Sequence, residues 1–480
     1  MSTVQGTLVN IIFCCIILLF SRFLWNYVFS PLKSFPGPVA ASFTNLWRLQ
    51  DVFSGRCHIT HLDLHRKLGS VVRMGPNVLS LSDPQMLNQV YTSRKPWLKS
   101  DLYNVNDVLL PGGIRLKNLF SHQDEQWHLT YIRPVKGLYS IAKSQDFEPA
   151  MDVTINLFIE KMEERFMKPG KACDIADYIS YLAWDLMSQV TFSKDLGMLE
   201  TGCDTHKLME TSNKTLDYFA SISQIPKLDR LFDKNPFIRL GPPSFEWATN
   251  FVIQQYQDRL AKGSPDAHCT DYLDHFIDLK SKHPDIVDDN TIVMYTMSNV
   301  VAGSDTTASA MCSALYHVLK HPEVHEKLCQ ELRSAHLSLP AQWKNVQGLQ
   351  YLDAVMREAM RLTPGLPMLL ERVVPEGGFY LPDGRFVPEG TIVGMNSWVV
   401  NRNNAVFGDN TDSFIPERWL PSEHESNEQY QARLSKMKGT DMTFGAGPRI
   451  KLSKQDHEWT LINSWFTRQH DIPVIIQEIS

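Results

Sequence analysis

One long apolar helix, predicted from Thr291 to His321, constrains the fold of this chain more than any other stretch. Apolar residues run through it at helical spacing, and Pro322 follows directly and ends it. About 30 residues at about 1.5 Å each give a length of about 45 Å, enough to cross a large domain. A helix this long and this apolar is buried.

The middle of this helix breaks the apolar pattern at Ala302–Thr307, which reads Ala-Gly-Ser-Asp-Thr-Thr. A carboxylate and hydroxyls in a buried helix cost free energy unless they have partners or a function. The small pair Ala302 and Gly303 leaves room beside the helix. Asp305 and Thr306 form an acid–alcohol pair that can relay protons. The alternative is a helix kink that contains a hydrogen-bonded Asp305.

Composition indicates a large globular protein without a nucleic-acid signature. The chain has 480 residues, a hydrophobic content of 43% and a net charge of −6, so it can bury a sizeable core and has no polybasic character. Its eight cysteines show neither paired metal spacing nor a dense framework. We therefore expect free thiols in a reducing compartment.

The N-terminus carries a second apolar run, Val4–Phe20. With its flanks it reaches the roughly 20 residues that cross a bilayer. Lys and Arg follow this run and none precedes it, which predicts a membrane anchor with the bulk of the chain in the cytoplasm. A cleaved signal peptide is the rival interpretation, although the run lacks a charged start and a cleavage site. A buried core helix is the other alternative.

Residues 1–30 are thus predicted as an anchor and residues 31–480 as one domain. The proline-rich stretch Pro31–Pro38 cannot be helical and is predicted as a stiff hinge. Pattern and turn residues predict helices at Met151–Met167 and Asn345–Arg361, two strands about a turn within Ser70–Ser82, strands at Thr391–Gly394 and Trp398–Val400, helical spacing over Leu461–Phe466, and a terminal strand near Val474–Ile476.

Three stretches carry the chemistry-bearing residues of the C-terminal half. Glu358 and Arg361 stand at i and i+3 of a predicted helix and face the same way; exposed salt bridges are the plain alternative. Phe414–Trp419 reads Phe-Ile-Pro-Glu-Arg-Trp. Phe444–Lys451 has two glycines and a proline, which allow a tight turn and close approach to a flat ligand. The donor fork of Arg449 suits a carboxylate.

In this order, these stretches resemble the cytochrome P-450 monooxygenases, a family of haem-thiolate enzymes. Ala302–Thr307 matches the family's oxygen-activation motif at every fixed position, and Phe414–Trp419 closely matches its Pro-Glu-Arg-Trp segment. Phe444, Gly447 and Arg449 fall on the first three fixed positions of its haem-binding loop, Phe-x-x-Gly-x-Arg-x-Cys-x-Gly. The chain looks most like fungal members that oxidise secondary metabolites or plant defence compounds.

The resemblance implies a role for each of these residues. It makes haem the expected cofactor, with Asp305 and Thr306 as the residues that relay protons to bound oxygen. Residues 207–285 correspond to the family's lid over the substrate. The remaining implied roles are a buried charge network of Glu358, Arg361 and Arg418, and contacts to the haem carboxylates from Arg133, Arg372 and Arg449. For Arg133, an exposed basic helix end is the alternative.

The resemblance covers about residues 30 to 450, and residues 451–480 are atypical. The haem-ligating cysteine of the pattern falls on Lys451, and no cysteine follows Cys329. A thiolate pushes electron density into the iron and favours O–O cleavage. Lysine has no negative charge, and with a reference pKa of about 10.4 its deprotonation at neutral pH costs about 4–5 kcal/mol. His457 and His470 are interpreted as loop or surface histidines, so no residue is assigned as a metal ligand.

Three functional interpretations follow. The first is a monooxygenase by ancestry that inserts oxygen into an apolar metabolite, takes electrons from an NADPH-dependent reductase, and is inactive or impaired because of Lys451. The second is an active haem-thiolate enzyme whose sequence after Ile450 results from a mis-joined exon or a frame error. The third is a non-catalytic relative that binds a ligand or a partner. The expected fold is mainly α with a minor β portion (α+β), in one large domain at the endoplasmic reticulum membrane.

Overall fold

The computed structural model describes residues 27–109, 115–235, 237–242, 245–265, 270–446, 465–469 and 472–476, together with residues 462, 463 and isolated positions among residues 10–25. Most of the predicted anchor lies outside the described residues. Three positions of the predicted haem-binding loop, Gly447, Arg449 and Lys451, also lie outside them.

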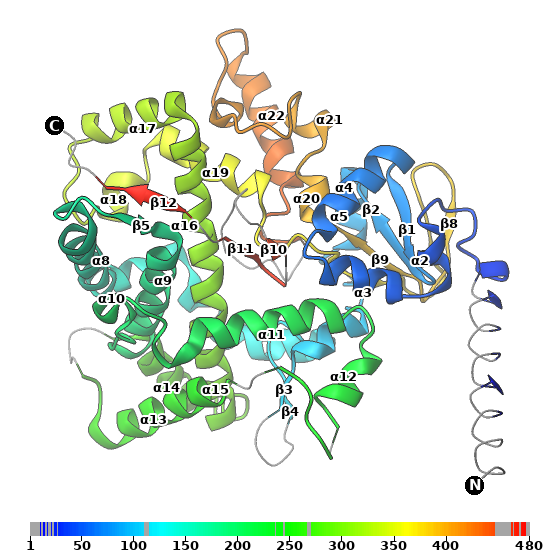
Figure 1. The fold of residues 1–480 in the computed structure, drawn as a ribbon, viewed down its shortest axis with the longest axis horizontal. Coiled ribbons are helices and arrows are strands. Elements are labelled where there is room, and N and C mark those ends of the chain that lie inside the picture. Colours follow the sequence, from blue (N-terminus) through cyan, green and yellow to red (C-terminus); the bar gives the residue numbers. More distant parts are fainter. Residues whose placement is uncertain are drawn as a thin grey trace.

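The described chain is mainly helical, as the sequence predicts (Figure 1). The first helices are α2 (Val39–Phe43), α3 (Leu46–Phe53), α4 (Cys57–Leu68), α5 (Leu87–Val90), α6 (Glu125–Val135), α7 (Ile141–Ser144) and α8 (Glu148–Met162). They are followed by α9 (Ile175–Phe192), α10 (Met198–Thr201), α11 (Leu208–Ile222), α12 (Lys227–Phe232), α13 (Glu246–Lys262), α14 (Tyr272–Lys282), α15 (Asp289–Met297) and α16 (Gly303–Lys320). The last are α17 (Pro322–Ser334), α18 (Trp343–Val346), α19 (Gln350–Leu362), α20 (Ser397–Val400), α21 (Asn404–Phe407) and α22 (Asn427–Thr440).

The strands form small sheets. The largest has four strands in the order β1-β2-β9-β6, with β2 and β9 parallel and the other pairs antiparallel. Its members are β1 (Val71–Gly75), β2 (Val78–Leu81), β6 (Arg372–Val373) and β9 (Ile392–Met395). Two-stranded sheets pair β3 (Val108–Leu109) with β4 (Arg115–Leu116), β7 (Phe379–Tyr380) with β8 (Phe386–Val387), β10 (Ile462–Asn463) with β11 (Thr467–Arg468), and β12 (Pro473–Ile475) with β5 (Ala172–Asp174).

The long central helix is confirmed, with one local departure. It consists of α15, a π-helical turn at Ser298–Ala302, and α16, and it ends just before Pro322. In Figure 1 it runs through the middle of the molecule, where α16 packs beside α9. A Cβ at Gly303 would lie 2.6 Å from the side chain of Met187 on α9. Glycine at this position therefore allows the two helices to approach closely.

Several predicted elements are confirmed and two are wrong. The hairpin within Ser70–Ser82 forms as β1 and β2, and the terminal strand forms as β12. Trp398–Val400 is helical, because the side chain of Asn396 caps α20 by accepting from the amide of Trp398 at 2.9 Å. The helical spacing over Leu461–Phe466 is also wrong, since the described residues there belong to β10 and its connection to β11.

Two observations bear on the remaining expectations. The six cysteines that the structure describes are free. In the described part of the chain, no helix is both long enough and apolar enough to span a bilayer.

Candidate functional site

Asp305 lies half-buried in the first turn of α16. Its oxygens accept hydrogen bonds from the indole nitrogen of Trp184 on α9, at 3.1 Å, and from the hydroxyl of Ser212 on α11. Burial raises the pKa of Asp305 to about 6, and the two hydrogen bonds act in the opposite direction. An acid with a pKa near neutrality can both take up and release a proton under ordinary conditions.

The neighbouring alcohol has a different partner. Thr306 Oγ1 donates to the carbonyl oxygen of Ala302 at 2.7 Å, and its side chain is buried. This bond one turn back along the helix is the usual partner of a threonine within a helix. The acid and the alcohol of the predicted pair therefore lie side by side in sequence without bonding to each other in this state.

The structure brings Glu358, Arg361 and Arg418 together. Arg361 donates to both oxygens of Glu358, at 2.8 and 2.9 Å, and Arg418 Nε donates to Oε1 at 3.2 Å. The indole of Trp419 donates to Oε2 at 2.9 Å. Burial acts to raise the pKa of Glu358, but the charges of the two arginines hold it below its usual value. These residues tie α19 to the Pro-Glu-Arg-Trp turn at Pro416–Trp419.

Arg372 is a buried guanidinium on β6, next to the residue that pairs with Arg48. It donates to the carbonyl of Glu371 at 2.8 Å and to the hydroxyl of Tyr103 at 3.4 Å, and it stacks over the ring of Tyr91 at 5.1 Å. Among the described residues no carboxylate forms an ion pair with it. A buried arginine in such a setting fits a carboxylate supplied by a ligand.

The other two described candidates lie in different settings. Arg133 lies near the end of α6 with an exposed side chain. The first residue of α6, Glu125, lines a small hollow together with Arg372, so Arg133 lies about 12 Å further along the helix axis. Phe444 is half-buried in the turn before the undescribed loop. The structure therefore brings Arg372 close to the start of α6 but does not bring Arg133 there.

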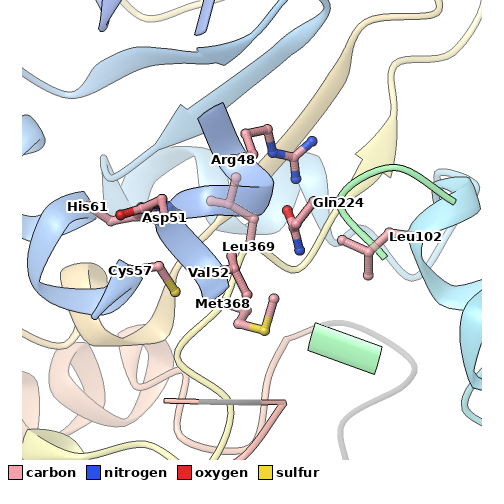
Figure 2. Close-up of a pocket in the computed structure, with 9 residues that line it drawn as sticks. All are labelled: Arg48, Asp51, Val52, Cys57, His61, Leu102, Gln224, Met368 and Leu369. Carbon is pink, nitrogen blue, oxygen red and sulfur yellow. Dashed lines mark ion pairs between the residues drawn. The ribbon is translucent and has the colours of Figure 1, made fainter. Parts of the chain in front are cut away.

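A small pocket lies between α3, α4 and the chain before β6 (Figure 2). It has room for about one water molecule. Asp51 Oδ2 lies there without a hydrogen bond, 3.6 Å from Nε2 of His61. Burial raises the pKa of Asp51 to about 6 and lowers that of His61 to about 3. The residues that line it are Arg48, Asp51, Val52, Cys57, His61, Leu102, Gln224, Met368 and Leu369.

Sequence reasoning missed Ser212 and Trp184 as partners of Asp305. Ser212 is 93 residues away and Trp184 is 121 residues away. Neither belongs to a motif, and a serine in an uneven helical stretch carries no signal of its own. Only the contacts of Trp184 on α9 and Ser212 on α11 with Asp305 on α16 reveal them.

Comparison with known proteins identifies the class. The family model of cytochrome P-450 matches residues 35–450. The cytochrome P-450 monooxygenase cfoH of Aspergillus candidus is 36% identical over 493 residues, which cover 96% of this chain and 91% of that protein. The monooxygenase pkfB of Emericella nidulans is 34% identical over 497 residues, which cover 97% and 96%. The chain belongs to the cytochrome P-450 family, whose members use haem and electrons supplied by a reductase.

These alignments also extend beyond the matched family model. Because 97% of the 480 residues lie in the alignment with pkfB, it continues past Ile450 into the C-terminal segment. The alignment is also longer than this chain. Within the aligned region, pkfB therefore has residues that this chain lacks.

The residues of this chain fit the carboxylates of haem but do not supply the thiolate that ligates its iron. Arg372 suits a haem carboxylate, because it is buried and has no carboxylate partner among the described residues. No cysteine follows Cys329 in the sequence, so the chain supplies no thiolate after Arg449. When bound through a thiolate, haem supplies oxygen activation.

Proposed function

We propose that this chain descends from a monooxygenase that inserts one oxygen atom into an apolar secondary metabolite. The Asp305–Thr306 pair in α16 carries the proposal, because an acid with a pKa of about 6 next to a buried alcohol suits proton transfer. The names of fungal relatives, including cfoH and pkfB, describe monooxygenases. In this assignment Asp305 holds and passes a proton, Thr306 receives it, and Arg372 and Arg449 hold the haem carboxylates.

With this sequence the enzyme is inactive or impaired, because Lys451 stands at the position of the thiolate. Haem should bind weakly through its carboxylates and without the electronic effect of sulfur. The test is the carbon monoxide difference spectrum of the purified, haem-supplemented and reduced chain. We expect no thiolate-type spectrum. A thiolate-type spectrum from this chain would show that the enzyme is competent with Lys451 in place.

A second candidate is an active enzyme whose C-terminal sequence is altered in this chain by a mis-joined exon or a frame error. The packing of the C-terminal segment favours a loss of internal residues over a frame error. Trp465 and Thr467 are buried, and β12 pairs with β5. The alignment with pkfB also continues past Ile450. Residues before and after the undescribed loop thus pack as parts of one fold.

If residues were lost from this chain, replacing them should restore the thiolate-type spectrum. The segment of pkfB that aligns between Ile450 and Ile462 is transplanted into this chain, and the reduced carbon monoxide spectrum is recorded. We expect a thiolate-type spectrum in the chimera and none in the parent chain. The transcript across the codons for Pro448–Ser480 should contain the missing codons. A chimera that folds and binds haem without that spectrum would contradict an internal loss as the cause.

A non-catalytic relative that binds a ligand or a partner is the third candidate. Haem content separates it from the second, because an active enzyme must copurify with haem and a scaffold need not.

We also propose that residues 1–30 anchor the chain in the endoplasmic reticulum membrane, where a membrane-bound NADPH-dependent reductase supplies electrons. The apolar run Val4–Phe20 supports this proposal. Alkaline carbonate should leave the full chain in the membrane fraction and release a form without residues 1–30.

A further inference from the structure

Two side chains from other helices hold the carboxylate of Asp305. Trp184 on α9 donates its indole N–H to Oδ1, and Ser212 on α11 donates its hydroxyl to Oδ2. Trp184 and Ser212 are both fully buried. Hydrogen bonds to an ionised acceptor are stronger than those between neutral groups. The two donors therefore fix the position of the acid.

The alcohol of the predicted relay is not one of these partners. Because Thr306 Oγ1 donates to the carbonyl of Ala302, the carboxylate faces α11 and α9 and the hydroxyl faces its own helix. In this state the donors to Asp305 come from α9 and α11, and Thr306 is not one of them.

Two charged residues near Asp305 are linked to α11 through its sequence neighbour Asp204 and through an ion pair. Arg468 on β11 acts to lower the pKa of Asp305, and Asp204, just before α11, acts to raise it. Arg468 is itself paired with Asp217 on α11. α11 thus contacts the carboxylate directly through Ser212 and positions a nearby cation through Asp217.

We infer that Ser212 is a positioning residue for Asp305, which holds the carboxylate toward α11 and stabilises its ionised form. A displacement of α11 then changes both the direction of the acid and its affinity for a proton. α11 (Leu208–Ile222) falls within residues 207–285, the stretch that the resemblance compares with the family's substrate lid. The inference rests on the proposed function, in which Asp305 relays protons.

Trp184 provides a direct probe of this link, because its indole N–H donates to the carboxylate. The full chain is labelled with ¹⁵N-tryptophan, and the indole resonance of Trp184, assigned with Trp184→Phe, is followed against pH. We expect a midpoint near 6. In Ser212→Ala the midpoint should rise by about one pH unit, because the ionised form loses a donor. Ser212→Thr retains a hydroxyl and should restore the lower midpoint.

Ser221→Ala is the matched control, since Ser221 lies on the same helix and is not a partner of Asp305. It should leave the midpoint unchanged. Asp305→Asn should abolish the titration. An unchanged midpoint in a folded Ser212→Ala protein would overturn the inference, as would a titration that persists in Asp305→Asn.

Hydrogen exchange provides a second measurement that remains usable if Ser212→Ala is less stable than the parent chain. Hydrogen exchange of the α11 peptide should rise in Ser212→Ala and in Asp305→Asn, with no further rise in the double variant; additive effects would overturn the link. These readouts need neither haem nor turnover. Failure of the proposed function would instead appear as a thiolate-type carbon monoxide spectrum from the parent chain.

Discussion

At the scale of single residues, Glu358 is a buried acid that accepts hydrogen bonds from three other side chains. Its two oxygens accept from Arg361, Arg418 and the indole of Trp419, and both Glu358 and Arg361 are fully buried. A buried ion pair contributes little net stability when intact, but removing one member leaves the other charges without compensation. The network therefore specifies a single arrangement of α19 and the turn after Phe414.

Replacing Glu358 with Gln should lower the free energy of unfolding by about 3–5 kcal/mol, because two buried guanidinium groups lose their counter-charge. Urea denaturation followed by circular dichroism measures the change. The matched control is Glu376→Gln at an exposed position, which should shift stability by less than about 0.5 kcal/mol. Equal effects in the two variants would show that the network is not a stabilising unit.

At the scale of elements, α4 presents a row of neutral histidines to the interior. His58, His61 and His65 are all buried. His65 is hydrogen-bonded at both ring nitrogens, to the carbonyl of Gly69 at 2.9 Å and to the hydroxyl of Ser80 at 2.7 Å. Burial lowers the pKa of His65 to about 4 and that of His58 and His61 to about 3. These bonds suit the uncharged ring.

The α4 histidines should make the protein sensitive to acid. Their folded-state pKa values lie below the 6.5 of the unfolded chain, so their contribution is complete above about pH 6.5 and is lost as pH falls toward 4. For His65 the loss is about 2 kcal/mol at pH 5. Asp51 opposes it, because its folded-state pKa of about 6 exceeds 3.8, and the cost of its buried charge is relieved below about pH 6.

The test compares unfolding free energies at pH 7 and pH 5. His65→Gln should lose about 2 kcal/mol less than the parent chain over this interval, because one titrating group is gone. His424→Gln, at an exposed position, should keep the full loss. If the parent and His65→Gln lose the same stability, another group causes the acid sensitivity.

The sequence predicts elements where local chemistry decides them. The turn Gly75-Pro76-Asn77 yields the β1–β2 hairpin, and Pro322 ends α16. Trp398–Val400 has the composition of a strand, but its capping residue Asn396 makes it helical; Asn396 is itself held by the carbonyl of Pro367. The π-helical turn before Gly303 has no local signal.

In the candidate site, contacts between residues close in sequence could be predicted, and contacts between distant residues could not. Glu358 and Arg361 are one turn apart and belong to a motif, so their pairing could be predicted. The bond from Ser212 to Asp305 joins residues 93 positions apart. It depends on where α11 lies relative to α16, which no local pattern encodes. Long-range partners of a correctly predicted residue are therefore the part of the site that requires a structure.

At the scale of the whole molecule, the C-terminal segment joins regions that are far apart in sequence. Trp465 packs in a cluster with Val52 of α3 and Met368 of the chain before β6. Thr467 Oγ1 lies 3.1 Å from Oγ of Ser309 on α16. Further on, Val474 pairs with Cys173 between β12 and β5. Residues after Ile450 thus contribute to the same core as α3 and α16.

Replacing Trp465 with Ala therefore distinguishes an in-frame C-terminus from an unrelated tail. Trp465 is 3% exposed and meets the ring of Phe120 edge-on at 5.8 Å between centroids. Loss of a buried tryptophan should lower the free energy of unfolding by about 3–5 kcal/mol. Phe237→Ala is the control for loss of a large ring, since Phe237 is 90% exposed and should change stability by less than about 0.5 kcal/mol. If Trp465→Ala is as mild as Phe237→Ala, the C-terminal segment is not part of the core. The frame-error explanation would then replace an internal loss. A large effect means that Trp465 belongs to the same core as α3 and the chain before β6, which is the outcome expected of an internal loss.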